Sequence, residues 1–278
     1  MAQINSSSKN MVSIQAPGKA NSSGWSSKIV IGILLTLALF VLWTSMIGSG
    51  AGQSSSSDAS KSSLAHSKDS SAASQITEGT LGSTPYYHCG PGTNVDSSSE
   101  IKHIVLLHGA RFTKEDWKSS GILDMLCHYN QLSVTAFDLN VKSTYKELVP
   151  LLKQLGNTHM ATLPIAALVT PSASGLSVVS ALRDGQLSQI QALVNLWVPV
   201  ASGSVQQLTA PQLAAAKNKD FTILAMNGDQ DGMGQTVGHK LANEAGAETM
   251  EFRGGHPFYL SIPREFTNAL VQILDVNH

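Results

Sequence analysis

Three side chains with the chemistry of a covalent hydrolase stand at the ends of predicted strands. Ser172 lies in LVTPSASG, Asp231 in LAMNGDQDGMG and His256 in EFRGGHPFYL. Their order along the chain is nucleophile, acid, base, whereas chymotrypsin-like and subtilisin-like enzymes order the same groups differently. If the strands are parallel, all three residues meet at the carboxyl edge of the sheet. The pattern predicts hydrolytic acyl chemistry through a Ser-His-Asp triad.

Two neighbouring serines compete for the role of nucleophile. The turn that exposes such a serine is so tight that the residues two positions before and after it must be small. For Ser172 these neighbours are Thr170 and Ser174, whereas for Ser174 one of them is Leu176, whose side chain would crowd the turn. Either serine would also serve as an ordinary helix N-cap. Sterics favours Ser172 as the nucleophile.

The acid and the base are chosen by their positions in glycine-containing loops. Asp229 and Asp231 both follow the strand that ends in LAM, and aspartates in such turns often only cap backbone amides. Asp231 lies deeper in the loop, so its carboxylate is the better candidate to orient a histidine ring. His256 follows two glycines and precedes Pro257, and histidine exchanges protons readily near neutral pH. We expect Asp231 as the acid, His256 as the base and His108 as a structural histidine.

Negative charge that develops on the substrate requires an oxyanion hole of two backbone N–H donors. Ala173, directly after the nucleophile, is expected to supply one donor. The second should come from the loop in LLHGARF, from Ala110 or, if the loop turns differently, from Arg111. Arg111 is also a candidate substrate-contact residue, with an ordinary surface cation as the alternative. We expect no cofactor and no metal.

Strand and helix patterns alternate from residue 100 onward, which is typical of a parallel sheet with helices on both faces. Strands are predicted at 103–107, 133–138, 165–170, 193–200, 221–226 and 248–252, and helices at 114–129, 143–155, 175–187, 206–217, 234–245 and 263–275. The predicted fold class is α/β. Since only about twenty residues separate the strands that end at 200 and begin at 221, we expect an open site with no large lid.

Four motifs, LLHGARFTKEDW, VTPSASG, NGDQDGMGQT and GGHPFYL, resemble in this order those of the α/β-hydrolase domain-containing protein 14 family. The resemblance spans residues 100–276 and implies an α/β-hydrolase fold with minimal or no lid. It places the family's nucleophile, acid and base on Ser172, Asp231 and His256. One branch of the family is a single-pass type II membrane protein. A soluble branch is associated with acyl-ester hydrolysis and with removal of acetyl groups from protein lysines.

The chain departs from this family pattern in two places. The family has serine two positions before the nucleophile, where this chain has the β-branched Thr170. The family also has a glycine-rich turn after the second strand, where this chain reads DLNVKSTYKE. We expect the first change to affect the tight turn and the second to reshape one wall of the site.

The leading functional hypothesis is a membrane-anchored serine hydrolase that cleaves a small acyl ester, thioester or amide. One alternative is an acyltransferase or deacetylase-type enzyme, in which a thiol or amine intercepts the acyl-enzyme. The other is a catalytically idle hydrolase fold used as a binding domain. The expected partners are a small acyl substrate or an acylated protein, and a lipid bilayer. A net charge of −1 without a basic block argues against nucleic acid.

The N-terminal residues are predicted to stay outside the hydrolase domain. Residues 1–28 form a polar tail, 29–47 an uncharged apolar span, 48–83 a disordered linker rich in Ser and Gly, and 84–278 the α/β-hydrolase domain. At about 1.5 Å per residue the span reaches about 28 Å, close to the thickness of a bilayer core. An uncleaved transmembrane signal anchor is expected. A cleaved signal peptide, an organellar transit peptide and a buried helix are the alternatives.

Charges and cysteines bear on the compartment. Lys9, Lys19 and Lys28 precede the span with no acid among them, which places the N-terminus in the cytosol and the catalytic domain on the other side. Cleavage would instead give a secreted or organellar protein. Cys89 and Cys127 are able to pair in an oxidising lumen, whereas two cysteines in a core of this size are more often ordinary buried thiols, so the sequence leaves their pairing open.

Overall fold

The computed structural model describes residues 75–91, 100–139, 147–217 and 220–276, all within the unit Ser67–His278. The predicted tail 1–28, the apolar span 29–47 and most of the predicted linker lie outside the described residues. Within the described ranges, no helix combines the length and apolar character that a membrane crossing requires. The transmembrane anchor therefore stays a prediction.

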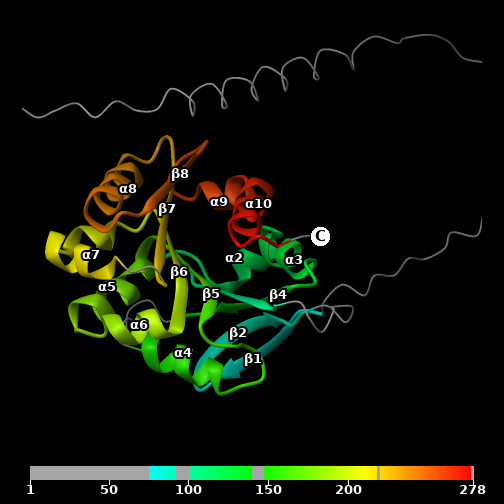
Figure 1. The fold of residues 1–278 in the computed structure, drawn as a ribbon. Coiled ribbons are helices and arrows are strands. Elements are labelled where there is room, and N and C mark those ends of the chain that lie inside the picture. Colours follow the sequence, from blue (N-terminus) through cyan, green and yellow to red (C-terminus); the bar gives the residue numbers. More distant parts are fainter. Residues whose placement is uncertain (1–74, 92–99, 140–146, 218–219, 277–278) are drawn as a thin grey trace, which may run out of the picture. The chain divides into compact units, whose positions relative to one another are not determined.

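An eight-stranded sheet forms the centre of the domain, in the order β1-β2-β4-β3-β5-β6-β7-β8 (Figure 1). The strands are β1 (Thr77–Leu81), β2 (Thr84–Cys89), β3 (Lys102–Leu106), β4 (Leu132–Phe137), β5 (Ile165–Pro171), β6 (Val194–Val200), β7 (Thr222–Gly228) and β8 (Glu248–Phe252). β1 and β2 are antiparallel to their neighbours, and β3 to β8 pair in parallel. The α/β class with a mostly parallel sheet is confirmed, and the six predicted strands agree with β3–β8 to within two residues.

Helices cover both faces of this sheet. They are α2 (Lys114–Ser119), α3 (Ile122–Cys127), α4 (Leu148–Gly156), α5 (Gly175–Arg183), α6 (Leu187–Leu193), α7 (Ala210–Ala216), α8 (Gly232–Ala245), α9 (Phe258–Ser261) and α10 (Pro263–Ile273), with the 3₁₀ turns η2 (Ser172–Ser174) and η3 (Gly203–Gln207). In one core cluster, the helices from α4 through α8 pack against one face of the sheet. In a second cluster, α2, α3, α9 and α10 pack against the opposite face. In β3 and the residue after it, Val105 and Leu107 enter the first cluster, whereas Ile104 and Leu106 enter the second. Burial on both faces explains the uninterrupted apolar runs of the central strands.

The predicted boundary at residue 84 is wrong, because the ordered domain includes a hairpin that begins earlier. β1 pairs with β2 from Thr77 to Leu81, within the stretch predicted as linker. Leu81 is buried in the core, and Glu78 forms an ion pair of 2.8 Å with the buried ammonium group of Lys114 on α2. These contacts with distant residues stabilise a strand that its own composition does not indicate.

Cys89 and Cys127, whose pairing the sequence leaves open, form a disulfide. The bond joins the last residue of β2 to the last residue of α3, across 38 positions of sequence. Both residues belong to the buried cluster on the α3 and α10 face. The disulfide therefore ties the N-terminal hairpin to the helical layer.

Two long predicted helices are broken in the structure. The helix expected over 114–129 divides into α2 and α3, since Gly121 adopts a φ of 80° between them. The helix expected over 206–217 becomes η3 followed by α7, and α7 begins with a capping box formed by Thr209 and Gln212. Helices α6 and α9 were not predicted.

Candidate active site

Ser172 stands at the sharp turn between β5 and α5. β5 ends at Pro171, and Ser172 opens the 3₁₀ turn η2. The backbone φ of Ser172 is 51°, in the left-handed region that residues other than glycine rarely adopt. A strained serine between a strand and a helix is the arrangement that exposes a nucleophile above the edge of a sheet.

Close packing around this turn requires a small residue at position 175. A Cβ atom at Gly175 would lie 2.3 Å from the Oγ atom of Ser202, so the loop after β6 packs directly against the turn. The competing serine, Ser174, is buried, and its hydroxyl donates to the carbonyl oxygen of Pro171 at 2.8 Å. The buried hydroxyl of Ser174 therefore stabilises the turn and does not face solvent.

Thr170, the departure from the family pattern, is accommodated by the sheet. It is fully buried, and its hydroxyl oxygen accepts a hydrogen bond of 2.8 Å from the indole N–H of Trp197 on β6. Its carbonyl oxygen accepts a second bond, of 2.7 Å, from the hydroxyl of Ser202. The Thr170 side chain is thus held by the neighbouring strand. The other departure falls largely on residues 140–146, outside the described residues.

Asp231 lies at the N-terminus of α8 with its two carboxylate oxygens engaged differently. Oδ1 accepts a hydrogen bond of 3.0 Å from the backbone N–H of Gly234. Oδ2 lies 2.8 Å from Nδ1 of His256. The side chain is only 7% exposed, and a Cβ atom at Gly234 would lie 2.9 Å from Oδ2. Glycine at 234 therefore leaves the space that the carboxylate occupies.

His256 joins the other two side chains. Its Nδ1 faces Asp231 at 2.8 Å, and its Nε2 lies 2.8 Å from Oγ of Ser172. Beside a carboxylate, Nδ1 of the neutral ring carries the proton and donates it, so Nε2 is free to accept from the serine hydroxyl. The structure thus brings Ser172, Asp231 and His256 into one chain of hydrogen bonds. Asp229 lies outside it, because its Oδ1 accepts from the N–H of Gly254.

The loop after β3 lies next to Ser172. A Cβ atom at Gly109 would lie 3.5 Å from Cβ of Ser172. Ala110, the predicted oxyanion donor, is the next residue in this loop. Ala173, the other predicted donor, follows Ser172 within η2. Arg111 is exposed. Both loops that should supply the oxyanion hole therefore flank the nucleophile.

His108 is buried and acts as a support, as expected. Its Nδ1 lies 2.9 Å from the carbonyl oxygen of Gly109. Its Nε2 accepts a hydrogen bond of 2.8 Å from the backbone N–H of Leu139. The ring therefore fixes the start of the loop after β3 to the residues that follow β4.

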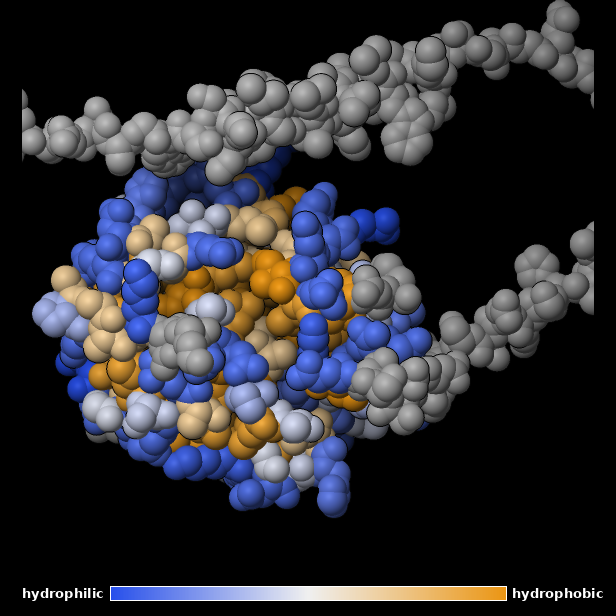
Figure 2. Space-filling view, in the orientation of Figure 1, coloured by the Kyte–Doolittle hydropathy of each residue, from blue (hydrophilic) through white to orange (hydrophobic). Residues whose placement is uncertain are grey.

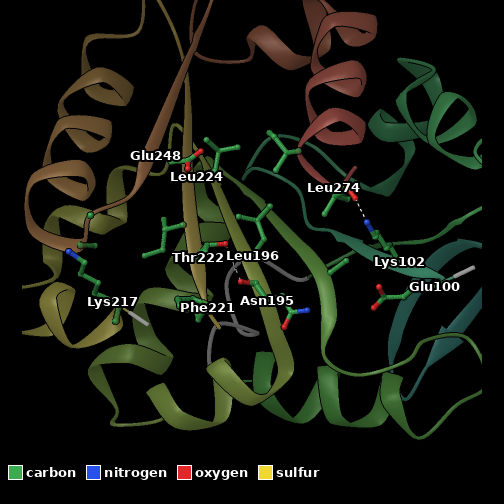
Figure 3. Close-up of a pocket in the computed structure, with 16 residues that line it drawn as sticks. Glu100, Lys102, Asn195, Leu196, Lys217, Phe221, Thr222, Leu224, Glu248 and Leu274 are labelled. Carbon is green, nitrogen blue, oxygen red and sulfur yellow. Dashed lines mark hydrogen bonds between the residues drawn. The ribbon is translucent and has the colours of Figure 1, made fainter. Parts of the chain in front are cut away.

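The site is open to solvent. The side chain of His256 is 46% exposed, and the connection from β6 to β7 contains only η3 and the short α7 among its described residues. A hollow of about 640 Å³ lies at the amino edge of the sheet, and neither Ser172 nor His256 lines it. Figure 2 shows apolar surface in the middle of that face, and Figure 3 shows Leu196 and Leu224 between Lys217 and Lys102. Substrate access to Ser172 thus does not depend on that hollow.

No group of three or more metal-ligating side chains comes together among the described residues. The polar groups that the site offers are the serine hydroxyl, the imidazole, the carboxylate and backbone N–H groups. These groups suit acyl transfer through a covalent intermediate.

Comparison with known proteins places the chain in a family. No established family profile matches it. The protein named "Putative protein-lysine deacylase ABHD14B" from Homo sapiens is 30% identical over 181 residues, which cover 62% of this chain and 82% of the relative. The protein of the same name from Pongo abelii is also 30% identical, with the same coverage.

Solved structures show the same fold. The S-formylglutathione hydrolase FrmB from Staphylococcus aureus has a TM-score of 0.54 and 12% sequence identity, over 72% of this chain and 97% of the other. A predicted CIB-like hydrolase from Thermoplasma acidophilum has a TM-score of 0.50 and 18% identity, over 73% and 98% of the two chains. The fold is therefore that of the α/β-hydrolases, and the chain is a hydrolase that belongs to the α/β-hydrolase domain-containing protein 14 family.

Proposed function

We propose that this protein is a serine hydrolase that cleaves a small acyl ester, thioester or amide with Ser172 as nucleophile, His256 as base and Asp231 as acid. The observation that carries the proposal is the pair of 2.8 Å contacts that link Asp231 to His256 and His256 to Ser172. The three residues come from three different loops at the carboxyl edge of the sheet. Open α/β sheets place their sites at this edge.

In the proposed mechanism, Oγ of Ser172 attacks the acyl carbonyl carbon while its proton passes to Nε2 of His256. Asp231 stabilises the resulting imidazolium through Nδ1. The oxyanion is stabilised by the backbone N–H groups of Ala173 and Ala110. The proton on Nε2 then passes to the leaving alcohol, thiol or amine, and the Ser172 ester remains. Water, deprotonated by His256, hydrolyses that ester and releases the carboxylic acid.

The solvent exposure of the site supports substrates in which the acyl group is attached to a large leaving group, such as a protein. Because His256 is about half exposed, an acyl group on a protein side chain would reach Ser172 without a lid having to open. The names of the relatives, which describe protein-lysine deacylases, support an acylated lysine as one substrate. We propose small acyl groups on esters, thioesters or lysine amines as the substrate class.

Labelling with a fluorophosphonate probe tests this proposal. Wild-type protein should be labelled, and Ser172→Ala should not. An unlabelled wild-type protein would favour the idle binding domain. Incubation with an acetyl-lysine peptide and a thiol then separates hydrolysis from transfer, since the first releases acetate and the second releases an acetylated thiol. Hydrolysis is the expected result.

We further propose that residues 29–47 anchor the protein in a membrane, with the hydrolase domain on the non-cytosolic side. The uncharged span and the lysines before it support the anchor and its orientation. The disulfide between Cys89 and Cys127 supports an oxidising compartment. The full chain should resist alkaline carbonate extraction, and a chain that begins at Ser67 should be soluble. A mature chain that begins near Ala51 would instead identify a cleaved leader.

A further inference from the structure

The position of the His256 ring depends on its hydrogen bonds with Asp231 and Ser172 and on the backbone that carries it. The side chain is 46% exposed, so packing against neighbouring side chains constrains only part of it. His256 follows β8 after Gly254 and Gly255, and Gly254 has a φ of 127°, which is strained for any other residue. Such a flexible stretch needs contacts with a neighbouring loop to hold one conformation.

Three hydrogen bonds join this stretch to the loop after β7. The N–H of Asp229 donates to the carbonyl oxygen of Phe252 at 2.7 Å, and the N–H of Gln230 donates to that of Gly254 at 2.9 Å. The third bond uses a side chain, because the N–H of Gly254 donates to Oδ1 of Asp229 at 2.8 Å. Gly254 is therefore fixed through both its N–H and its carbonyl group.

The two loops also approach each other too closely for a side chain between them. A Cβ atom at Gly228 would lie 2.2 Å from the carbonyl oxygen of Gly254 and 2.6 Å from that of Gly255. Asp231, three residues after Gly228, holds Nδ1 of His256. The junction around Asp229 and Gly254 thus sets the distance between the acid and the base.

We propose that Asp229 is a positioning residue for His256: by holding the N–H of Gly254, it keeps Nε2 of His256 in line with Ser172. The inference rests on the proposed function, since it assigns His256 as the base. It goes beyond the interpretation from sequence that an aspartate in this turn only caps a backbone amide. Asp229 acts through the backbone and touches no reacting atom.

Three variants test this role. Asp229→Ala removes the acceptor for the Gly254 N–H. Asp229→Asn keeps an oxygen acceptor at the same position. Gln212→Ala is the matched control, because Gln212 likewise accepts from a backbone N–H, that of Thr209 at 2.9 Å, but at the start of α7. For each variant, kcat and KM with p-nitrophenyl acetate, the melting temperature, and amide exchange of residues 254–257 are measured.

Asp229→Ala should lower kcat about 10- to 100-fold, because small misplacements of a catalytic group cost this much. KM should change by less than about twofold, since the base acts after binding. The melting temperature should fall no further than in Gln212→Ala, amide exchange at 254–257 should accelerate, and Asp229→Asn should recover most of the lost turnover.

The proposal is overturned if Asp229→Ala and Gln212→Ala lose the same turnover, or if Asp229→Asn is as impaired as Asp229→Ala. Unchanged amide exchange at 254–257 in Asp229→Ala would also overturn it. Failure of the proposed function looks different, because wild-type protein would then not be labelled by a fluorophosphonate. The exchange measurement would still decide whether Asp229 holds the segment that carries His256.

Discussion

His256 and His103, two of the histidines that lie beside hydroxyl groups, have opposite surroundings. At the carboxyl edge, Nε2 of His256 lies 2.8 Å from the hydroxyl of Ser172, and the ring is about half exposed. Inside the sheet, His103 on β3 is 2% exposed. Its Nδ1 lies 2.9 Å from the hydroxyl of Ser133, and its Nε2 lies 3.1 Å from that of Thr135. Residue types alone do not distinguish the two regions.

Burial favours the neutral form of His103, and the hydrogen bonds of Ser133 indicate which ring nitrogen carries the proton. The hydroxyl of Ser133 donates to the carbonyl oxygen of Met160 at 3.0 Å, so it accepts from Nδ1 of His103. Nε2 then accepts from Thr135. Burial, and to a smaller extent the neighbouring ring of His88, lower the pKa of His103 to about 3. No carboxylate of the described residues forms an ion pair with this ring.

The comparison shows what a histidine needs in order to act as a base. The base must hold the proton of the serine in the intermediate, which requires a charged imidazolium to be tolerated. At His256, a carboxylate and solvent stabilise that charge, whereas at His103 burial opposes it. Exposure and the acid, rather than the contact with a hydroxyl, mark the proposed catalytic site.

Replacing Ser172 should have the largest effect of any single change. Ser172→Ala should lower kcat/KM for p-nitrophenyl acetate by about 10⁴-fold or more, as in other triads. Ser133→Ala, at the buried histidine, should leave turnover near the wild-type value and cost about 1–3 kcal/mol of stability, because the partner groups lose a bond. Ser174→Ala should lose only its bond to Pro171. Greater loss of turnover in Ser174→Ala than in Ser172→Ala would reassign the nucleophile.

Removing the carboxylate charge of Asp231 should leave His256, like the buried His103, without an anion to stabilise its imidazolium. Asp231→Asn keeps an oxygen for the N–H of Gly234 but offers an amide to Nδ1, which disfavours the productive tautomer. Turnover should fall by about 10⁴-fold, as for the same change in a protease triad. Steady-state kinetics and fluorophosphonate labelling rates give the measurement. A variant with near-wild-type activity would mean that Asp231 is not the acid.

The proposed catalytic residues could be chosen from sequence because each is marked by local rules. Small neighbours mark the turn at Ser172, and glycines mark the loops of Asp231 and His256. The apolar runs of β3–β8 show their burial directly, so those strands were predicted to within two residues.

Features that depend on distant contacts could not be predicted in this way. β1 needs its pairing with β2 and the ion pair of Glu78 with Lys114, two residues 36 positions apart. The disulfide requires that β2 and α3 lie side by side, which no spacing indicates. The hydrogen bond from Gly254 to Asp229 likewise joins residues 25 positions apart. The sequence therefore indicates a turn residue at Asp229 but not its contact with the segment that carries His256.

Reduction of the disulfide should separate stability from activity. A bond that closes a loop of 38 residues should contribute about 4 kcal/mol on the chain-entropy estimate. Cys89→Ala/Cys127→Ala should therefore unfold at lower urea concentration. Turnover at 25 °C should stay within about twofold of wild type, because neither cysteine contacts the proposed site and a stability loss of this size leaves most domains folded. Loss of turnover in a variant that circular dichroism shows to be folded would contradict this.

Mild acid should destabilise the protein through the buried histidine. Because the pKa of His103 is lowered from an unfolded value of 6.5 to about 3, the unfolded chain binds more protons between these values. Stability should therefore be fully present above about pH 6.5 and decline as the pH falls toward 3, by about 1 kcal/mol per pH unit. Burial lowers the pKa of His88 as well, which adds in the same direction.

Melting temperatures between pH 7 and pH 5 give the measurement. His103→Gln should flatten the slope, whereas His128→Gln, at an exposed position, should leave it unchanged. Equal slopes in wild type and His103→Gln would show that the buried ring is not the group that titrates.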